Sequence, residues 1–140
     1  GRRQIIQNKP TVMLDVAHNP QATTLLARDI QNNKQYKRVI AVVAMLQDKD
    51  IEATLSPMLA FVSRWYCASL DVPRGANSST LVSAVLRSQQ RVLEYDSVSV
   101  AYQVALEEAK EDDLVLVFGS FFTVADILKL GALTPYNKVE

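Results

Sequence analysis

The chain has 140 residues, enough to bury a hydrophobic core as one domain. Its 15 lysines and arginines balance 15 aspartates and glutamates, so no general charge field would draw it to nucleic acid or an anionic membrane. The longest apolar run, residues 39–46, is too short to cross a bilayer, and a single cysteine forms no internal disulfide. Without a recognisable signal peptide, we expect a cytoplasmic protein, and the missing initiator methionine suggests a fragment of a longer chain.

Extended segments rich in valine, isoleucine and leucine alternate with segments of helical periodicity. The turn at residues 8–10 predicts a hairpin between the first two extended segments, so the opening strand should be an antiparallel edge. In residues 22–30, 81–86 and 98–109, apolar side chains recur on one helical face that is wide enough to cover a sheet. The extended segments are residues 4–7, 12–16, 38–45, 64–70, 91–95 and 114–118.

Two helix boundaries depend on single residues. Residues 51–62 share one apolar face, but Pro57 would interrupt the hydrogen-bond ladder. We therefore expect a short turn and then a second helix capped by Ser56. The last helix should begin after an N-cap at Ser120 and end at Gly131.

The remaining apolar residues fit a packed α/β interior. We assign Cys67 to the core as a small hydrophobe, and Phe121 and Phe122 to the core or at most to one wall of a site. The alternation of strands and helices predicts a Rossmann-like, doubly wound α/β fold. Its sheet should be mostly parallel, with about six strands, an antiparallel N-terminal edge strand and helices on both faces.

Polar residues follow three of the predicted strands. Because the carboxyl ends of parallel strands meet at one edge of a sheet, we expect these residues to share a ligand-binding edge. Each also has a structural interpretation: Asp15 could cap the turn after its strand, His18 could be a structural hydrogen bonder, and Asn19 is a natural N-cap before a proline. The three polar segments are residues 15–20, 46–50 and 118–123.

Phosphate-binding loops are missing from the sequence. It contains neither G-x-G-x-x-G nor G-x-x-x-x-G-K-[ST], and it has only 4 glycines. If this domain handles a nucleotide, another domain must hold most of the phosphates.

Five blocks, taken together and in order, resemble the C-terminal domain of the folylpolyglutamate synthases, a family that includes the bifunctional dihydrofolate synthases and lies in the Mur ligase superfamily. The resemblance covers nearly the whole chain, which would make residues 1–140 a Mur ligase-type C-terminal domain that lacks its N-terminal ATP-binding domain. The blocks are Asp-Val-Ala-His-Asn-Pro at 15–20, Met-Leu-Gln-Asp-Lys-Asp at 45–50, Trp-Tyr-Cys-Ala at 65–68, Pro-Arg-Gly-Ala at 73–76 and Val-Phe-Gly-Ser-Phe-Phe-Thr-Val at 117–124.

The resemblance implies an ATP-dependent carboxylate–amine ligase that adds L-glutamate to dihydropteroate and to folates through an acyl phosphate. ATP and Mg²⁺ would be bound mainly by the missing N-terminal domain, so the isolated domain should be inactive, and no residue here is assigned as a metal ligand. The implied partners are the three substrates and the protein's own N-terminal domain, in a monomer without nucleic-acid or membrane partners.

Residue roles also follow from the resemblance. Arg2 and Asp15 match the ATP-contacting arginine and aspartate of the family. A guanidinium group binds phosphate well, and a carboxylate accepts hydrogen bonds from ribose hydroxyls. His18 would lie beside the transferring phosphoryl group and donate a hydrogen bond to its developing negative charge. The glutamate-binding candidates are Asn19, Lys49 and Ser120, with Arg74 a weaker candidate for a substrate carboxylate.

Two other functions remain open. A receiver-like regulatory module would use Asp15 as a phosphoacceptor, but such modules need an acidic pair near the amino end and a lysine after the last strand, where residues 119–121 read Gly-Ser-Phe. A fragment of a peptidoglycan-precursor ligase would share the chemistry and differ in the amino acid that it adds.

Overall fold

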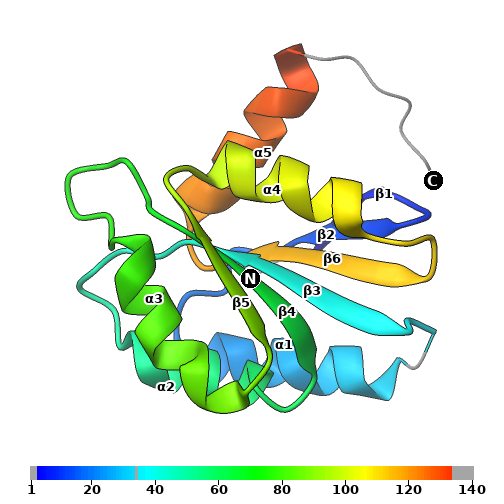
Figure 1. Ribbon diagram of the computed structural model, residues 1–140, viewed down its shortest axis with the longest axis horizontal. Coiled ribbons are helices and arrows are strands. Elements are labelled where there is room, and N and C mark those ends of the chain that lie inside the picture. The colour runs from blue at the N-terminus through cyan, green and yellow to red at the C-terminus, as the bar shows by residue number, and fades with distance from the viewer. Residues whose placement is uncertain (1–2, 34, 134–140) are drawn as a thin grey trace.

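The computed structural model describes residues 3–33 and 35–133, and in these ranges strands and helices alternate along the chain (Figure 1). The strands are β1 (Gln4–Gln7), β2 (Thr11–Leu14), β3 (Arg38–Val43), β4 (Val62–Ala68), β5 (Arg91–Tyr95) and β6 (Asp113–Phe118). The helices are α1 (Pro20–Asn32), α2 (Ile51–Leu55), α3 (Ser78–Val85), α4 (Val98–Glu108) and α5 (Phe121–Leu133), with 3₁₀ turns η1 (Ser56–Met58) and η2 (Leu86–Ser88).

The strands form one sheet in the order β1-β2-β6-β3-β4-β5. β1 runs antiparallel to β2, and all the other neighbours are parallel. The predicted doubly wound α/β fold and its antiparallel edge strand are therefore confirmed. The last strand in the sequence, β6, lies between the second and third, and it pairs with both.

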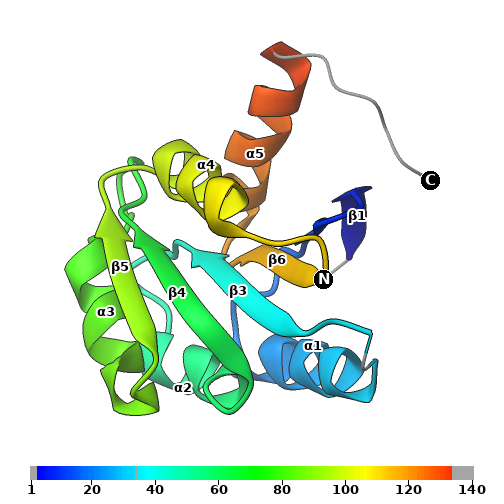
Figure 2. The ribbon, with the colours of Figure 1, turned by 45° about the vertical axis from the view of Figure 1, so that its right-hand side comes forward.

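Helices cover both faces of the sheet, and each face has its own hydrophobic core (Figure 2). α1, α2 and α3 pack on one face, and α4 and α5 on the other. The central strand β6 contributes side chains to both cores: Leu114 and Leu116 belong to the first, and Val115 and Val117 belong to the second. Burial on both faces explains why this strand reads as a continuous apolar run.

The cysteine lies in the first core, as predicted. Cys67 is fully buried on β4. Burial, and to a lesser degree the carboxylate of Glu94, raises the pKa of its thiol to about 12. The thiolate is therefore scarce near neutral pH, and the side chain acts as a small hydrophobe rather than as a nucleophile.

Two helix-boundary predictions were wrong. Ser56 does not cap a second helix: it lies in η1, which has Leu55 at its N-cap, and its Oγ instead accepts a hydrogen bond from Arg87 Nη2 at 3.1 Å. Proline fits this short 3₁₀ turn as well as it fits the first turn of a helix. Gly131 does not end α5, which continues to Leu133, because a glycine weakens a helix without ending it unless the chain turns there.

An ion pair between Arg38 and Asp113 links the amino ends of the neighbouring strands β3 and β6. Asp113, whose side chain is 2% exposed, accepts hydrogen bonds from Arg38 Nε at 3.1 Å, Arg38 Nη2 at 2.6 Å and the backbone N–H of Lys110 at 2.8 Å. Burial alone would raise the pKa of this carboxyl group. The hydrogen bonds from Arg38 and Lys110 outweigh that effect, so the pKa of Asp113 lies below its usual range.

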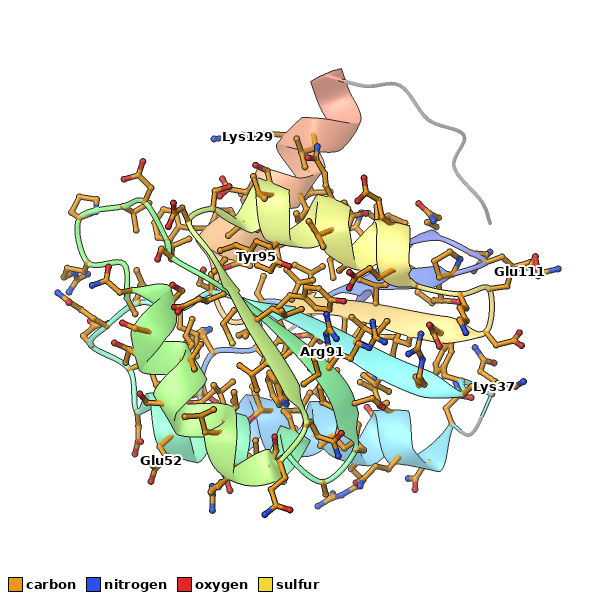
Figure 3. All side chains as sticks on the ribbon, in the orientation of Figure 1. Lys37, Glu52, Arg91, Tyr95, Glu111 and Lys129 are labelled. Carbon is orange, nitrogen blue, oxygen red and sulfur yellow. The ribbon has the colours of Figure 1, made fainter. Side chains whose placement is uncertain are left out.

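We expect Arg38→Met to lower the free energy of unfolding by about 2–3 kcal/mol at pH 7, because it leaves a buried carboxylate without its charged partner. The neighbouring Lys37, which projects into solvent (Figure 3), provides a matched control: its 3.8 Å pair with Asp112 is exposed on both sides, so Lys37→Met should cost less than about 0.5 kcal/mol. Urea denaturation measures both values. Equal losses in the two variants would contradict the importance of the buried pair.

The same pair has a pH dependence of known sign. The folded-state pKa of Asp113 is depressed, so its stabilisation is fully present above the unfolded-state pKa of about 3.9 and is lost as the pH falls through the folded-state pKa. The difference in stability between the unsubstituted protein and Arg38→Met should therefore shrink as the pH falls below about 4.

Candidate functional site

A pocket of about 200 Å³ lies at the carboxyl edge of the sheet. The segments after β2 and β3 lead to helices on one face, whereas the segment after β6 leads to α5 on the other. Such a reversal opens a crevice at strand ends, where open α/β sheets bind ligands. The pocket is lined by Val16 and His18 after β2, Leu46 and Lys49 after β3, and Gly119, Ser120, Phe121 and Phe122 after β6.

The turn after β6 approaches β3 so closely that only glycine fits it. Gly119 has φ +121°, in the region that side chains disfavour, and a Cβ there would lie 2.3 Å from the carbonyl oxygen of Ala44. Since that neighbour is backbone, it cannot swing aside. The close approach brings the start of α5 against the end of β3, beside the segment that bears Lys49.

Ser120 is the N-cap of α5, as predicted. Its Oγ accepts the N–H of Thr123 at 3.0 Å and lies 2.7 Å from Thr123 Oγ1. Thr123 Oγ1 in turn donates to the carbonyl oxygen of Ala44 at 2.7 Å. Both hydroxyl residues are at most 4% exposed, so the start of α5 is bonded to the end of β3 within the interior.

His18 and Asn19 form the link between β2 and α1. Asn19 caps α1 as predicted, since its Oδ1 accepts the N–H of Ala22 at 2.8 Å. His18 Nδ1 lies 2.9 Å from the carbonyl oxygen of Val16, which can only accept, so Nδ1 bears a proton. The neutral ring therefore has an acceptor at Nε2, and only the imidazolium form donates a hydrogen bond from that atom.

Asp15 lines a second hollow. It is 4% exposed, and its Oδ1 accepts the N–H of Ala17 at 2.8 Å, so the turn-capping interpretation holds. The same side chain also lines a hollow of about 180 Å³, bordered by the 2.6 Å ion pair of Arg3 with Asp29. Arg2, the other predicted ATP contact, lies outside the described residues.

The two basic glutamate-site candidates differ in their surroundings. Lys49 is half-buried at the pocket, and no ion pair of its ammonium group is found within residues 3–33 and 35–133. Arg74 is exposed, pairs with Asp48 at 3.1 Å and does not line the pocket. The structure thus brings His18, Lys49 and Ser120 into one pocket and leaves Asn19 and Arg74 out of its lining.

The aromatic pair is not in the core. Phe121 is 70% exposed and Phe122 43% exposed, and their rings meet edge to face at 6.3 Å between centroids. They form one wall of the pocket, the lesser of the two interpretations given to them. Both residues lie in the first turn of α5, at the pocket, whereas Val124, three residues after Phe121, is buried.

The part of the chain that the structure describes has neither a metal-binding cluster nor a membrane-spanning helix. No group of three or more histidine, cysteine, aspartate and glutamate side chains there could hold a metal ion. Among the same residues, no helix has the length and apolar character required to span a bilayer.

A family model described as "Mur ligase, glutamate ligase domain" matches residues 1–121. The chain belongs to this family. The model covers all three strand ends that meet at the pocket, up to Phe121.

Named relatives agree with this assignment. A dihydrofolate synthase/folylpolyglutamate synthase of Escherichia coli (strain K12) is 42% identical over 130 residues, which are 93% of this chain and 30% of the relative. The solved structure of E. coli FolC in complex with DHPP and ADP has a TM-score of 0.90 and 40% identity, over 97% of this chain and 32% of that chain.

A further solved structure, a bifunctional folylpolyglutamate synthase/dihydrofolate synthase with Mn, AMPPNP and L-glutamate bound, has a TM-score of 0.85 and 37% identity, over 93% of this chain and 31% of that chain. The family resemblance predicted from the sequence is confirmed. The present chain spans about 30% of the length of the first relative.

We expect Gly119→Ala to lower the free energy of unfolding by about 2–4 kcal/mol, because the new Cβ meets an unfavourable φ and a fixed backbone oxygen. Gly131→Ala is the control, since alanine favours the interior of a helix and should raise stability by up to about 1 kcal/mol. Thermal and urea unfolding of both variants measure the difference. Similar stability for the two would contradict the tight turn.

Proposed function

We propose that this chain is the amino-acid-binding domain of an ATP-dependent ligase that adds L-glutamate to dihydropteroate and to folates. One observation supports this function most directly: the pocket at the switch point of the sheet combines a lysine with no ion pair among the described residues, an imidazole and the cap of a helix. The relatives' names and the ligands of the solved structures, which include ADP, AMPPNP, Mn and L-glutamate, support the same substrates.

The reaction has two steps. A carboxylate oxygen of the folate precursor attacks the γ-phosphorus of ATP, which yields an acyl phosphate and ADP. The neutral amine of glutamate then attacks the acyl carbon, phosphate leaves with the electron pair of the C–O bond, and the nitrogen loses a proton to become an amide. Both steps develop negative charge on phosphoryl or acyl oxygens, so donors near these oxygens accelerate the reaction.

Four candidate residues divide these tasks, of which Lys49 and His18 line the pocket whereas Asn19 and Arg74 do not. The ammonium group of Lys49 binds a carboxylate of glutamate, because charge-assisted hydrogen bonds are among the stronger ones available. The Nδ2 amide of Asn19 donates to the same substrate while its oxygen caps α1. His18, in its imidazolium form, donates from Nε2 to the migrating phosphoryl group. Arg74 would bind a second carboxylate only after it released Asp48.

The nucleotide is bound jointly with a preceding domain. Asp15 contacts the ribose hydroxyls and Arg2 a phosphate, whereas the preceding domain supplies the phosphate loop and the Mg²⁺ ligands. This division fits a chain without a phosphate-binding loop and, in the part that the structure describes, without a metal-binding cluster. With this division, the reaction would take place between the two domains. We also propose that the enzyme is cytoplasmic.

The two alternative functions are less well supported. A receiver-like module needs an accessible phosphoacceptor, but Asp15 is 4% exposed and its Oδ1 is held by a backbone N–H. A peptidoglycan-precursor ligase would bind a different amino acid in the same pocket. Assays of ATP-dependent ligation by the full-length protein with glutamate, alanine and diaminopimelate separate these cases, and activity with alanine or diaminopimelate but not glutamate would refute the proposed substrate.

In the full-length enzyme, Lys49→Ala should raise the KM for glutamate roughly ten- to hundredfold and leave the KM for ATP largely unchanged, because it removes a donor to a charged carboxylate. Lys129 is a matched control: it is exposed on α5 and projects away from the sheet (Figure 3), so Lys129→Ala should change neither constant. If Lys49→Ala kept a normal KM and lost only thermal stability, Lys49 would be a surface residue without a substrate contact.

His18→Ala should lower kcat more than it raises the KM for glutamate or ATP, because an interaction with migrating charge is made chiefly in the transition state. Its melting temperature should change little, since the lost hydrogen bond to Val16 is local and only partly buried. An unchanged kcat with a lowered melting temperature would instead identify His18 as a structural residue.

A further inference from the structure

We propose that Arg74 is a positioning residue: by holding Asp48, it keeps a carboxylate away from the ammonium group of the neighbouring Lys49. The inference rests on the proposed function for the existence of a substrate carboxylate at Lys49. It replaces the role that the sequence gave to Arg74, a direct contact with that substrate.

Lys49 stands between two carboxylates in the sequence, and both are bonded elsewhere. Asp50 is the N-cap of α2, and its Oδ1 accepts the N–H of Ala53 at 3.2 Å. Asp48 Oδ2 accepts a hydrogen bond from Arg74 Nη1 at 3.1 Å. The ammonium group of Lys49 has no ion pair within residues 3–33 and 35–133, so its charge is left for a ligand in the pocket.

A carboxylate released beside Lys49 would compete with the substrate. A lysine side chain is long and flexible, so its ammonium group can turn toward a carboxylate on the adjacent residue. That competitor is tethered to the chain, whereas the substrate carboxylate has to arrive from solution. Even without direct contact, two negative charges near one cation repel each other and weaken binding. The pairing of Asp48 with Arg74 therefore favours the substrate.

The backbone presents Arg74 to the segment after β3. Leu46 and Gly75 form an antiparallel bridge, and the N–H of Gln47 donates to the carbonyl oxygen of Arg74 at 2.7 Å. Main-chain bonds thus hold the loop after β4 against the segment after β3, and they place the arginine opposite Asp48.

The loop after β4 is itself closed, which fixes the backbone of its arginine. The N–H of Leu70 donates to the carbonyl oxygen of Ala76 at 3.2 Å, and the N–H of Gly75 donates to that of Val72 at 2.9 Å. A Cβ at Gly75 would lie 1.7 Å from the carbonyl oxygen of Leu70, so only glycine lets the chain pass there. The backbone of Arg74 is therefore held on both sides.

Stability alone does not account for this ion pair. The side chains of Arg74 and Asp48 are 67% and 42% exposed, and exposed ion pairs contribute little to the free energy of unfolding. Arg74 also does not line the pocket. The pair therefore acts on the charge around the neighbouring lysine, and neither on the fold nor by touching the substrate.

A double-mutant cycle in the full-length enzyme tests this role. Arg74→Gln releases Asp48, so it should raise the KM for glutamate about fivefold to tenfold and leave kcat, the KM for ATP and the melting temperature nearly unchanged. Asp48→Asn alone should keep the KM for glutamate within about twofold of the unsubstituted enzyme. The double variant, Arg74→Gln with Asp48→Asn, should recover to the same range, since no free carboxylate remains beside Lys49.

Two outcomes of the cycle would overturn the inference. If Arg74 binds the substrate itself, the double variant keeps the raised KM of Arg74→Gln, because removing Asp48 does not replace the lost contact. If Arg74→Gln leaves the KM for glutamate unaltered, the pair has no effect on the lysine.

Two single variants serve as controls. Arg74→Lys keeps a cation that can pair with Asp48, so it should recover most of the affinity lost in Arg74→Gln, and a loss as large as that of Arg74→Gln would contradict the charge argument. Lys37→Gln removes the cation of another exposed pair, before the amino end of β3 (Figure 3), and should leave the KM unchanged. A raised KM in Lys37→Gln would assign the effect to net charge and refute the pairing role.

The proposed function and this inference fail in different ways. If the unsubstituted enzyme ligates another amino acid, the proposed substrate is wrong, and the same cycle with that amino acid still tests Arg74. If glutamate is the substrate but the double variant does not recover, only the inference is wrong.

Discussion

The hydrogen-bond ladders that hold β6 between β2 and β3 are the constraint on which the site depends. Each ladder fixes where a strand ends relative to its neighbours, and the functional residues follow within a few residues of those ends. His18, Lys49 and Ser120 are therefore positioned by main-chain bonds rather than by long side chains. The crossing of the chain from one face to the other at β6 then keeps the space between them open.

Several site residues also stabilise the fold. Asn19 and Ser120 cap the helices that follow their strands, and Asp15 caps the turn after β2. In Asn19 and Asp15 one atom of the side chain is used for structure and another remains for a ligand, so the structural and functional interpretations do not exclude one another. A side chain held at one end loses less freedom when it binds, which favours preorganisation.

Much of this architecture was predictable from local sequence. Continuous apolar runs marked the buried strands, the break at residues 8–10 marked the edge hairpin, and the strand-end rule gathered His18, Lys49 and Ser120. The position of β6 within the sheet was not predictable, because it depends on pairing between distant segments. Nor was the pairing of Arg74 with Asp48, which lie on different loops. The wrong helix boundary at Ser56 arose because one proline fits two kinds of turn.

The burial of Cys67 has a consequence for how this part of the protein responds to its chemical surroundings. It is the chain's only cysteine, and in the folded state both its location and its protonation keep it from electrophiles and oxidants. Thiol reagents therefore reach it only when the sheet opens. The rate of alkylation of this chain by a thiol reagent therefore reports the opening of its core.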